Sequence, residues 1–85
     1  MSKAQKLLER FLSKPSDFTF DELKRLLASR GYREEKTGKT SGSRISFINE
    51  RSKHVIRLHK PHPRPVLKMY QIHQIMEELK DKGVL

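Results

Sequence analysis

One histidine in this sequence stands among cations suited to chemistry on a phosphate. His59 ends an alternating segment that also carries Arg57, and Lys60 and Arg64 follow it. Neighbouring positive charges favour the neutral imidazole at pH 7, because a second charge beside them is disfavoured. A neutral imidazole can accept the proton of a ribose 2′-hydroxyl, while the cations stabilise charge that develops on the attacked phosphate. That reaction needs no metal and leaves a 2′,3′-cyclic phosphate. The alternative is that His59 is a polar strand-end residue, or binds phosphate without catalysis.

The positive charge of the chain is concentrated in residues 36–68. This segment holds nine of the 19 lysines and arginines but only one acid, Glu50, and so carries +8 of the formal net charge of +9. Segregated charge of this kind indicates a surface that binds a polyanion. The cations fall on predicted strands, loops and turns instead of on one face of an amphipathic helix. We therefore expect nucleic acid as the partner and not a membrane surface.

The composition excludes several other classes of function. The 85 residues predict one domain, 1–85, with a small core. The chain has no cysteine, which excludes disulfides and thiolate chemistry. It has neither a signal-peptide pattern nor an apolar run near the roughly 20 residues of a membrane span, so we expect a cytoplasmic protein. His59 and His62 lack a third ligand and are separated by Pro61, so no metal site and no cofactor are expected.

A glycine-rich segment, residues 38–43, contains the letters Gly-Lys-Thr but does not match a phosphate-binding loop of nucleotide hydrolases. That motif requires a glycine where this chain has Arg33, and a helix where a strand is predicted. We expect either a polar turn whose amides and Lys39 contact phosphate, or a solvated hairpin turn with no ligand.

The hydrophobic pattern predicts an α+β fold. Helical spacing covers residues 3–13, and Thr19 with Glu22 forms a capping box for a second helix that Gly31 ends. Strands are expected at 32–37, 44–48 and 54–59, the first of them an edge strand or a poorly buried one. A proline-rich connection at 60–65 and a helix at 66–82 follow. The strands form a three-stranded antiparallel sheet with helices on one face. The opposite face is left free to carry Arg44, Arg57 and His59.

The remaining histidines and tyrosines are predicted to have structural roles. We expect His54 and His73 to be ordinary surface or half-buried residues. Tyr32 and Tyr70 are expected to pack with a polar tip and not to stack on bases, because no aromatic ladder accompanies them.

The order of short motifs resembles the HicA family of toxins from toxin–antitoxin pairs. The residues that carry the resemblance are a compact helix at 21–27, the step Gly31-Tyr32, the strand motif Gly42-Ser43-Arg44-Ile45-Ser46-Phe47, a strand ending near His59, and a final helix that begins near Leu67-Lys68. The resemblance covers residues 19–82, and residues 1–14 look like an N-terminal helical extension. It implies a fold like that of double-stranded-RNA-binding domains, of order α-β-β-β-α. It also implies metal-independent cleavage of messenger RNA and neutralisation by a HicB-type antitoxin, with any oligomer formed only through that antitoxin.

One departure from the family pattern bears on catalysis. The family's catalytic histidine follows Gly-Ser, and this chain has Arg44 there. Arginine binds phosphate but cannot act as a general base near pH 7. Either His59 takes the role, or the protein is a non-catalytic module that binds double-stranded RNA or DNA; a third reading is a basic face that docks an acidic protein. In the first reading, the candidate RNA contacts are Lys39, Gly42, Ser43, Arg44, Arg57, Lys60, His62 and Arg64.

Overall fold

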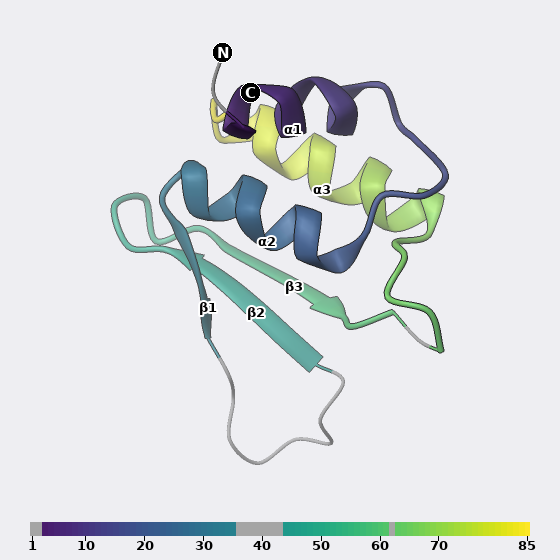
Figure 1. Cartoon of the computed structure of the whole chain (residues 1–85). Helices are drawn as coiled ribbons and strands as arrows, with labels where there is room; N and C mark the ends of the chain where they lie inside the picture. The colour runs from purple at the N-terminus through teal and green to yellow at the C-terminus, as the bar shows by residue number, and fades with distance from the viewer. Residues whose placement is uncertain (1–2, 36–43, 62) are drawn as a thin grey trace.

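The described part of the chain forms three helices and one antiparallel sheet. The computed structural model describes residues 3–35, 44–61 and 63–85. The elements in chain order are α1 (Lys3–Leu12), α2 (Phe20–Ser29), β1 (Tyr32–Glu35), β2 (Arg44–Asn49), β3 (Val55–His59) and α3 (Met69–Asp81). The strands lie in the order β1-β2-β3, and the helices gather on one side of them, with α1 farthest from the sheet (Figure 1). The predicted α+β fold and its α-β-β-β-α order are confirmed, and β1 is an edge strand as expected. No described helix is both long and apolar enough to cross a membrane.

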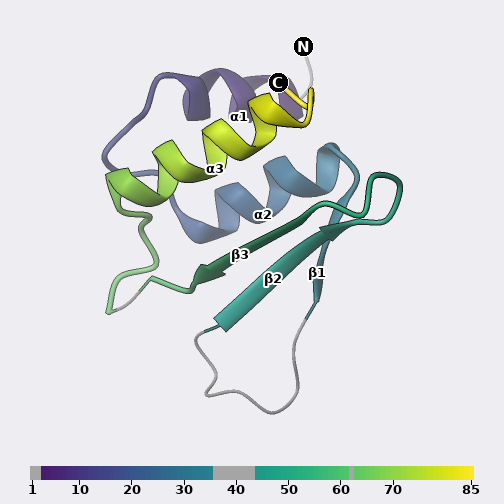
Figure 2. The same cartoon turned by 180° about the vertical axis from the view of Figure 1, so that it is seen from behind.

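The core lies between the inner face of the sheet and the helices. Alternate strand residues are buried, as the period of two in an extended chain requires. Phe47 of β2 contacts Phe20 of α2, with ring centroids 6.0 Å apart. Figure 2, seen from behind, shows α2 and α3 running over the strands. The other main core residues are Leu23, Leu26 and Leu27 of α2, Ile45 of β2, Ile56 and Leu58 of β3, and Ile72, Ile75, Met76 and Leu79 of α3.

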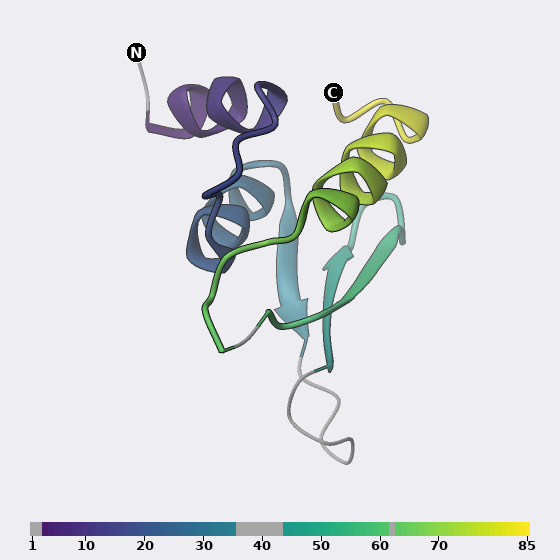
Figure 3. The same ribbon diagram turned by 90° about the vertical axis from the view of Figure 1, so that its right-hand side faces the viewer.

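The start of α2 is fixed by side chains, and α1 is joined to it there. The predicted capping box is present: Glu22 N–H donates to Thr19 Oγ1 at 3.1 Å, and Thr19 N–H donates to Glu22 Oε1 at 3.0 Å. Arg10 of α1 reaches the same carboxylate, with 2.7 Å from its Nε to Glu22 Oε2. The Phe11 ring is buried 5.4 Å from that of Phe18. The first helix therefore packs on α2, away from the strands, which Figure 3 shows from the side.

The last helix begins three residues later than the pattern of apolar residues predicts. Leu67 N–H donates to Phe18 O at 2.8 Å, and Phe20 N–H donates to Pro65 O at 2.8 Å. Val66 therefore forms an isolated bridge with Thr19 in place of a helical turn. The helix starts only after Lys68, which is extended at φ −79° and ψ 153°. The glycines expected to end α2 and α3 do have left-handed backbones, with φ of +91° at Gly31 and +71° at Gly83.

Candidate functional site

The outer face of the sheet brings three of the predicted site residues together. Arg44 lies directly opposite His59, and Ser46 lies opposite Arg57, in the antiparallel pairing of β2 with β3. Arg44, Arg57 and His59 are all exposed, while their neighbours Ile45, Ile56 and Leu58 are buried on the inner face. The strand alternation thus presents two guanidinium groups and one imidazole side by side to solvent, as the sequence predicts.

The register also fixes how closely Arg44 approaches His59. Asn49 N–H donates to His54 O at 2.9 Å, so Asn49 and His54 are a hydrogen-bonded pair. Hydrogen-bonded and non-hydrogen-bonded pairs alternate along an antiparallel ladder. Five steps along, Arg44 and His59 are therefore a non-hydrogen-bonded pair, in which the Cα atoms lie about 4.5 Å apart and the side chains approach most closely. One phosphate can contact both side chains.

Within the described residues, no acid neutralises the cations of this cluster, in contrast to three other cations of the fold. Arg10, Lys24 and Arg33 each form an ion pair with a carboxylate. The nitrogen–oxygen distances are 2.7–3.0 Å for the first two and 2.6 Å for the third. Within the described segments, Arg44 and Arg57 have no such partner. Unpaired exposed cations on one face are available to a polyanion.

The other predicted contacts are placed elsewhere or lie outside the described residues. The ammonium group of Lys60 lies 5.7 Å from the centroid of the Phe20 ring, a cation–π arrangement at the start of α2. Arg64 lines a separate groove with Asp17 and Met69. The structure therefore does not bring Arg64 into the cluster of Arg44 and His59. The remaining four predicted contacts, Lys39, Gly42, Ser43 and His62, lie outside the described residues.

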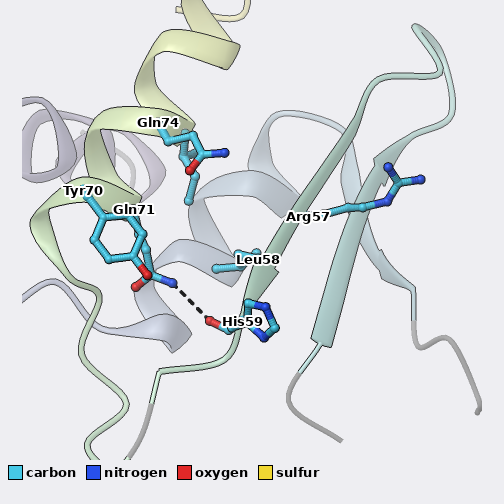
Figure 4. Close-up of a pocket in the computed structure, with 7 residues that line it drawn as sticks. Arg57, Leu58, His59, Tyr70, Gln71 and Gln74 are labelled. Carbon is cyan, nitrogen blue, oxygen red and sulfur yellow. Dashed lines mark hydrogen bonds between the residues drawn. The ribbon is translucent and has the colours of Figure 1, made fainter. Parts of the chain in front are cut away.

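A buried glutamine holds the strand end that carries His59. Gln71 Nε2 donates to His59 O at 3.1 Å, drawn as a dashed line in Figure 4. The other atom of the same amide, Oε1, accepts from Lys68 N–H at 3.0 Å and so caps the first turn of α3. One side chain thus fixes the helix start and the backbone at His59. The sequence analysis missed Gln71, although a glutamine three residues after the position that precedes a helix is a capping signal.

His54 is half-buried, as expected, but it belongs to a hydrogen-bonded network that the sequence did not reveal. Its Nδ1 lies 2.6 Å from Tyr32 Oη, and its Nε2 lies 3.3 Å from Glu78 Oε1. A carboxylate only accepts, so Nε2 donates to Glu78, and in the neutral ring Nδ1 accepts from the tyrosine hydroxyl. Burial, and then the charge of Glu78, raise the pKa of Tyr32. This network joins β1, β3 and α3.

The prediction for the two tyrosines is right for one and wrong for the other. Tyr32 is buried with its hydroxyl bonded, as expected. Tyr70, expected to pack, is 64% exposed. The reason is the helical period: Tyr70 lies two residues before Ile72, about 200° around the helix axis, so it points away from the core that Ile72 and Ile75 face. In the part of the chain that the structure covers, no three histidine or carboxylate side chains are grouped to hold a metal ion.

One comparison with known proteins found a match. A family model described as the HicA toxin of bacterial toxin–antitoxin systems matches residues 20–83. The match begins at α2 and includes the whole sheet and α3, so it contains Arg44, His59 and Gln71. Comparison with curated proteins and with solved structures gave no match. Because the matched segment is most of the chain and carries the expected order of elements, the protein belongs to the HicA toxin family.

Proposed function

We propose that this protein is a metal-independent endoribonuclease that cleaves messenger RNA as the toxin of a toxin–antitoxin pair, with His59 as its general base. Membership of the HicA family supports the class of activity. The observation that carries the assignment of His59 is its register with Arg44. The resemblance to the family places its catalytic histidine at position 44. The imidazole of this chain stands directly across the strand pair from it.

The proposed reaction uses the three residues of the cluster in different roles. His59 accepts the proton of the ribose 2′-hydroxyl, and the 2′-oxygen attacks the adjacent phosphorus. The bond from phosphorus to the 5′-oxygen breaks, and the leaving oxygen takes a proton from water. Arg44 and Arg57 stabilise the negative charge on the phosphate oxygens in the transition state. The products are a 2′,3′-cyclic phosphate and a free 5′-hydroxyl.

The first test is incubation of the purified protein with end-labelled single-stranded RNA in EDTA, followed by analysis of the product ends. We expect cyclic-phosphate ends from the wild-type protein. His59→Ala should slow cleavage at least roughly 100-fold, the lower range for general acid–base catalysis. It should bind RNA within a few-fold of wild type, because Arg44 and Arg57 remain. The matched control is His73→Ala, which removes an exposed histidine of α3 and should cleave normally.

Two results would contradict the proposal in different ways. Unchanged cleavage by His59→Ala would remove His59 from the mechanism. Intact RNA that the wild-type protein nevertheless binds would favour the second candidate, a non-catalytic module for double-stranded RNA or DNA. Arg44 is the observation that favours that candidate, because it replaces a base with a phosphate-binding cation. Its binding to a duplex should weaken with salt, with log K falling by about 0.9 per unit of log salt concentration for each phosphate contacted.

We further propose that a HicB-type antitoxin neutralises the toxin through the outer face of the sheet. The unpaired cations Arg44 and Arg57 support this proposal, because an acidic segment laid over them would exclude RNA from the same charges. The third reading of this surface, a basic face that docks an acidic protein, is therefore compatible with RNA cleavage by the free toxin.

A further inference from the structure

A small pocket opens between the free edge of β3 and the first two turns of α3. It is lined by Arg57 and His59 on the strand side and by Tyr70 and Gln74 on the helix side, and has a volume of about 190 Å³. An engineered protein cavity of about 150 Å³ accommodates benzene. The pocket therefore has room for a single planar ring system of the size of a nucleobase. Figure 4 shows Tyr70 and Gln74 on the helix side, and the side chain of Arg57 pointing away from them across the strands.

On the helix side of the pocket, the side chains of Tyr70 and Gln74 are available to a ligand. Tyr70 is one of only three large hydrophobic side chains exposed in the described residues. Gln74 lies four residues later, one turn along the same helix face. Among the residues the structure covers, neither the Tyr70 hydroxyl nor the Gln74 amide forms a hydrogen bond with the protein. By contrast, both polar atoms of the neighbouring Gln71 amide have a hydrogen-bond partner.

The strand side adds backbone polar groups. Arg57 pairs with Ser46 two steps along the ladder from the Arg44–His59 pair, so it too is in a non-hydrogen-bonded pair. The N–H and C=O of such a residue point away from β2, to the free edge of the strand. At His59 this edge faces α3, because its carbonyl accepts from Gln71. The pocket therefore combines an aromatic face, a side-chain amide and an exposed strand edge.

We propose that this pocket binds one unstacked nucleobase of the RNA, with Tyr70 as the stacking surface and Gln74 as the residue that reads the base edge; the inference rests on the proposed ribonuclease function. Aromatic side chains bind unpaired RNA bases by stacking, and amides pair with their edges. A glutamine amide can donate to and accept from adenine simultaneously, so adenine is the preferred base. Because Arg57 and His59 line both sites, the base belongs to a nucleotide next to the cleaved phosphate.

The test measures binding of labelled 2′-O-methyl oligonucleotides, which cannot be cleaved by 2′-hydroxyl attack, by fluorescence anisotropy. Each oligonucleotide is a run of uridines with a central A, G, C or U. The wild-type protein should bind the A-containing strand most tightly. Tyr70→Ala should weaken that binding at least roughly fivefold, the lower range for loss of one stacked base. Tyr70→Phe, which retains the ring, should bind as wild type does, and Gln74→Ala should abolish the preference for A.

A second measurement reports stacking directly, and a control separates the possible failures. 2-Aminopurine at the central position should lose fluorescence on binding to wild type but not to Tyr70→Ala. Met69→Ala is the matched control, because it removes an adjacent exposed side chain outside the pocket. Equal binding by Tyr70→Ala, Met69→Ala and wild type would overturn the pocket while leaving the ribonuclease proposal intact. Failure of the wild-type protein to bind any of these strands, although it cleaves RNA, would overturn the pocket alone, and failure to bind or cleave RNA itself would overturn both proposals.

Discussion

Two histidines mark the two ends of β3 and lie in opposite environments: His54 directly precedes the strand, and His59 is its last residue. At its start, the side chain of His54 is 8% exposed, and both ring nitrogens have partners, Tyr32 and Glu78. At its end, His59 is exposed beside Arg44, and in the described residues only its backbone carbonyl is bonded by a side chain. An imidazole whose nitrogens are already bonded cannot take a proton from a ligand without breaking the fold's own contacts. The difference assigns a structural role to one histidine and leaves the other for chemistry.

The same contrast holds for the charges around the two ends. The His54 end lies near the Arg33–Glu50 ion pair, whose atoms are 2.6 Å apart, and beside the carboxylate of Glu78. The His59 end faces Arg44, which no described acid neutralises. Exposed ion pairs contribute little to stability, with a median of about 0–1 kcal/mol. What distinguishes the two ends is therefore the availability of the imidazole: among the described residues, both ring nitrogens of His54 have partners, and the ring of His59 has none.

The largest expected effect comes from moving the imidazole across the strand pair. In the His59→Ala variant, a second substitution, Arg44→His, places an imidazole at the position directly opposite the one removed. We expect the double variant to recover cleavage at least roughly 10-fold over His59→Ala, part of the 10²–10⁴-fold that a positioned acid or base supplies. The measurement is the rate of formation of cyclic-phosphate ends in EDTA.

The control for this rescue is Arg44→Gln in the His59→Ala background, which has a polar side chain but no general base. It should stay as slow as His59→Ala itself. A double variant with Arg44→His that is equally slow, although folded and able to bind RNA, would show that the two positions do not serve one phosphate. The assignment of a shared site to Arg44 and His59 would then fail.

A smaller effect is expected at the His54 end of β3, on the stability of the protein and not on its activity. Tyr32→Phe removes the hydroxyl that bonds His54 Nδ1 and leaves a buried nitrogen without that partner. The cost should be about 1–3 kcal/mol in the free energy of unfolding, the usual penalty for a buried group left unsatisfied. Urea unfolding measures it, and RNA cleavage by the folded variant should equal wild type. A variant with native stability but impaired cleavage would reverse the roles given to the two ends.

How far the sequence could predict these features depends on the range of the interactions. Alternation of apolar and polar residues was enough to place Arg44, Arg57 and His59 on one exposed face, because side-chain direction along a strand is a local property. The capping box of Thr19 and Glu22 was readable for the same reason. The start of α3 was not, because the bridge of residues 65–67 with Phe18–Phe20 joins segments far apart in the chain. Tyr70 was misassigned for another reason, because it lies off the buried face of α3.

The sequence predicted only those site residues that belong to the family pattern or to the alternation along a strand. The pairing of Arg44 with His59 depends on the register of β2 with β3, and a shift by one residue would have placed Arg44 opposite Leu58. Gln71 and the network of Tyr32, His54 and Glu78 each join residues at least 12 positions apart. No local pattern specifies such partners, so they emerge only from the packed fold.

The smallest expected effect is a dependence of the free energy of unfolding on alkaline pH, which comes from Tyr32 at the His54 end of β3. The pKa of Tyr32 is raised above its ordinary value of 10.0, chiefly by burial. The neutral phenol is therefore favoured in the folded protein, and its contribution is fully present below pH 10. Above that pH the unfolded chain loses the proton first, so the contribution falls as pH rises towards the folded pKa. The stability difference between wild type and Tyr32→Phe should accordingly shrink between pH 9 and pH 11, roughly the range that brackets the ordinary tyrosine pKa. Urea titrations of both proteins across that range measure it, and Tyr70, present in both, cancels. A difference that stays constant would mean that the Tyr32 hydroxyl titrates alike in the folded and unfolded chains, and that the network at this end does not hold it neutral.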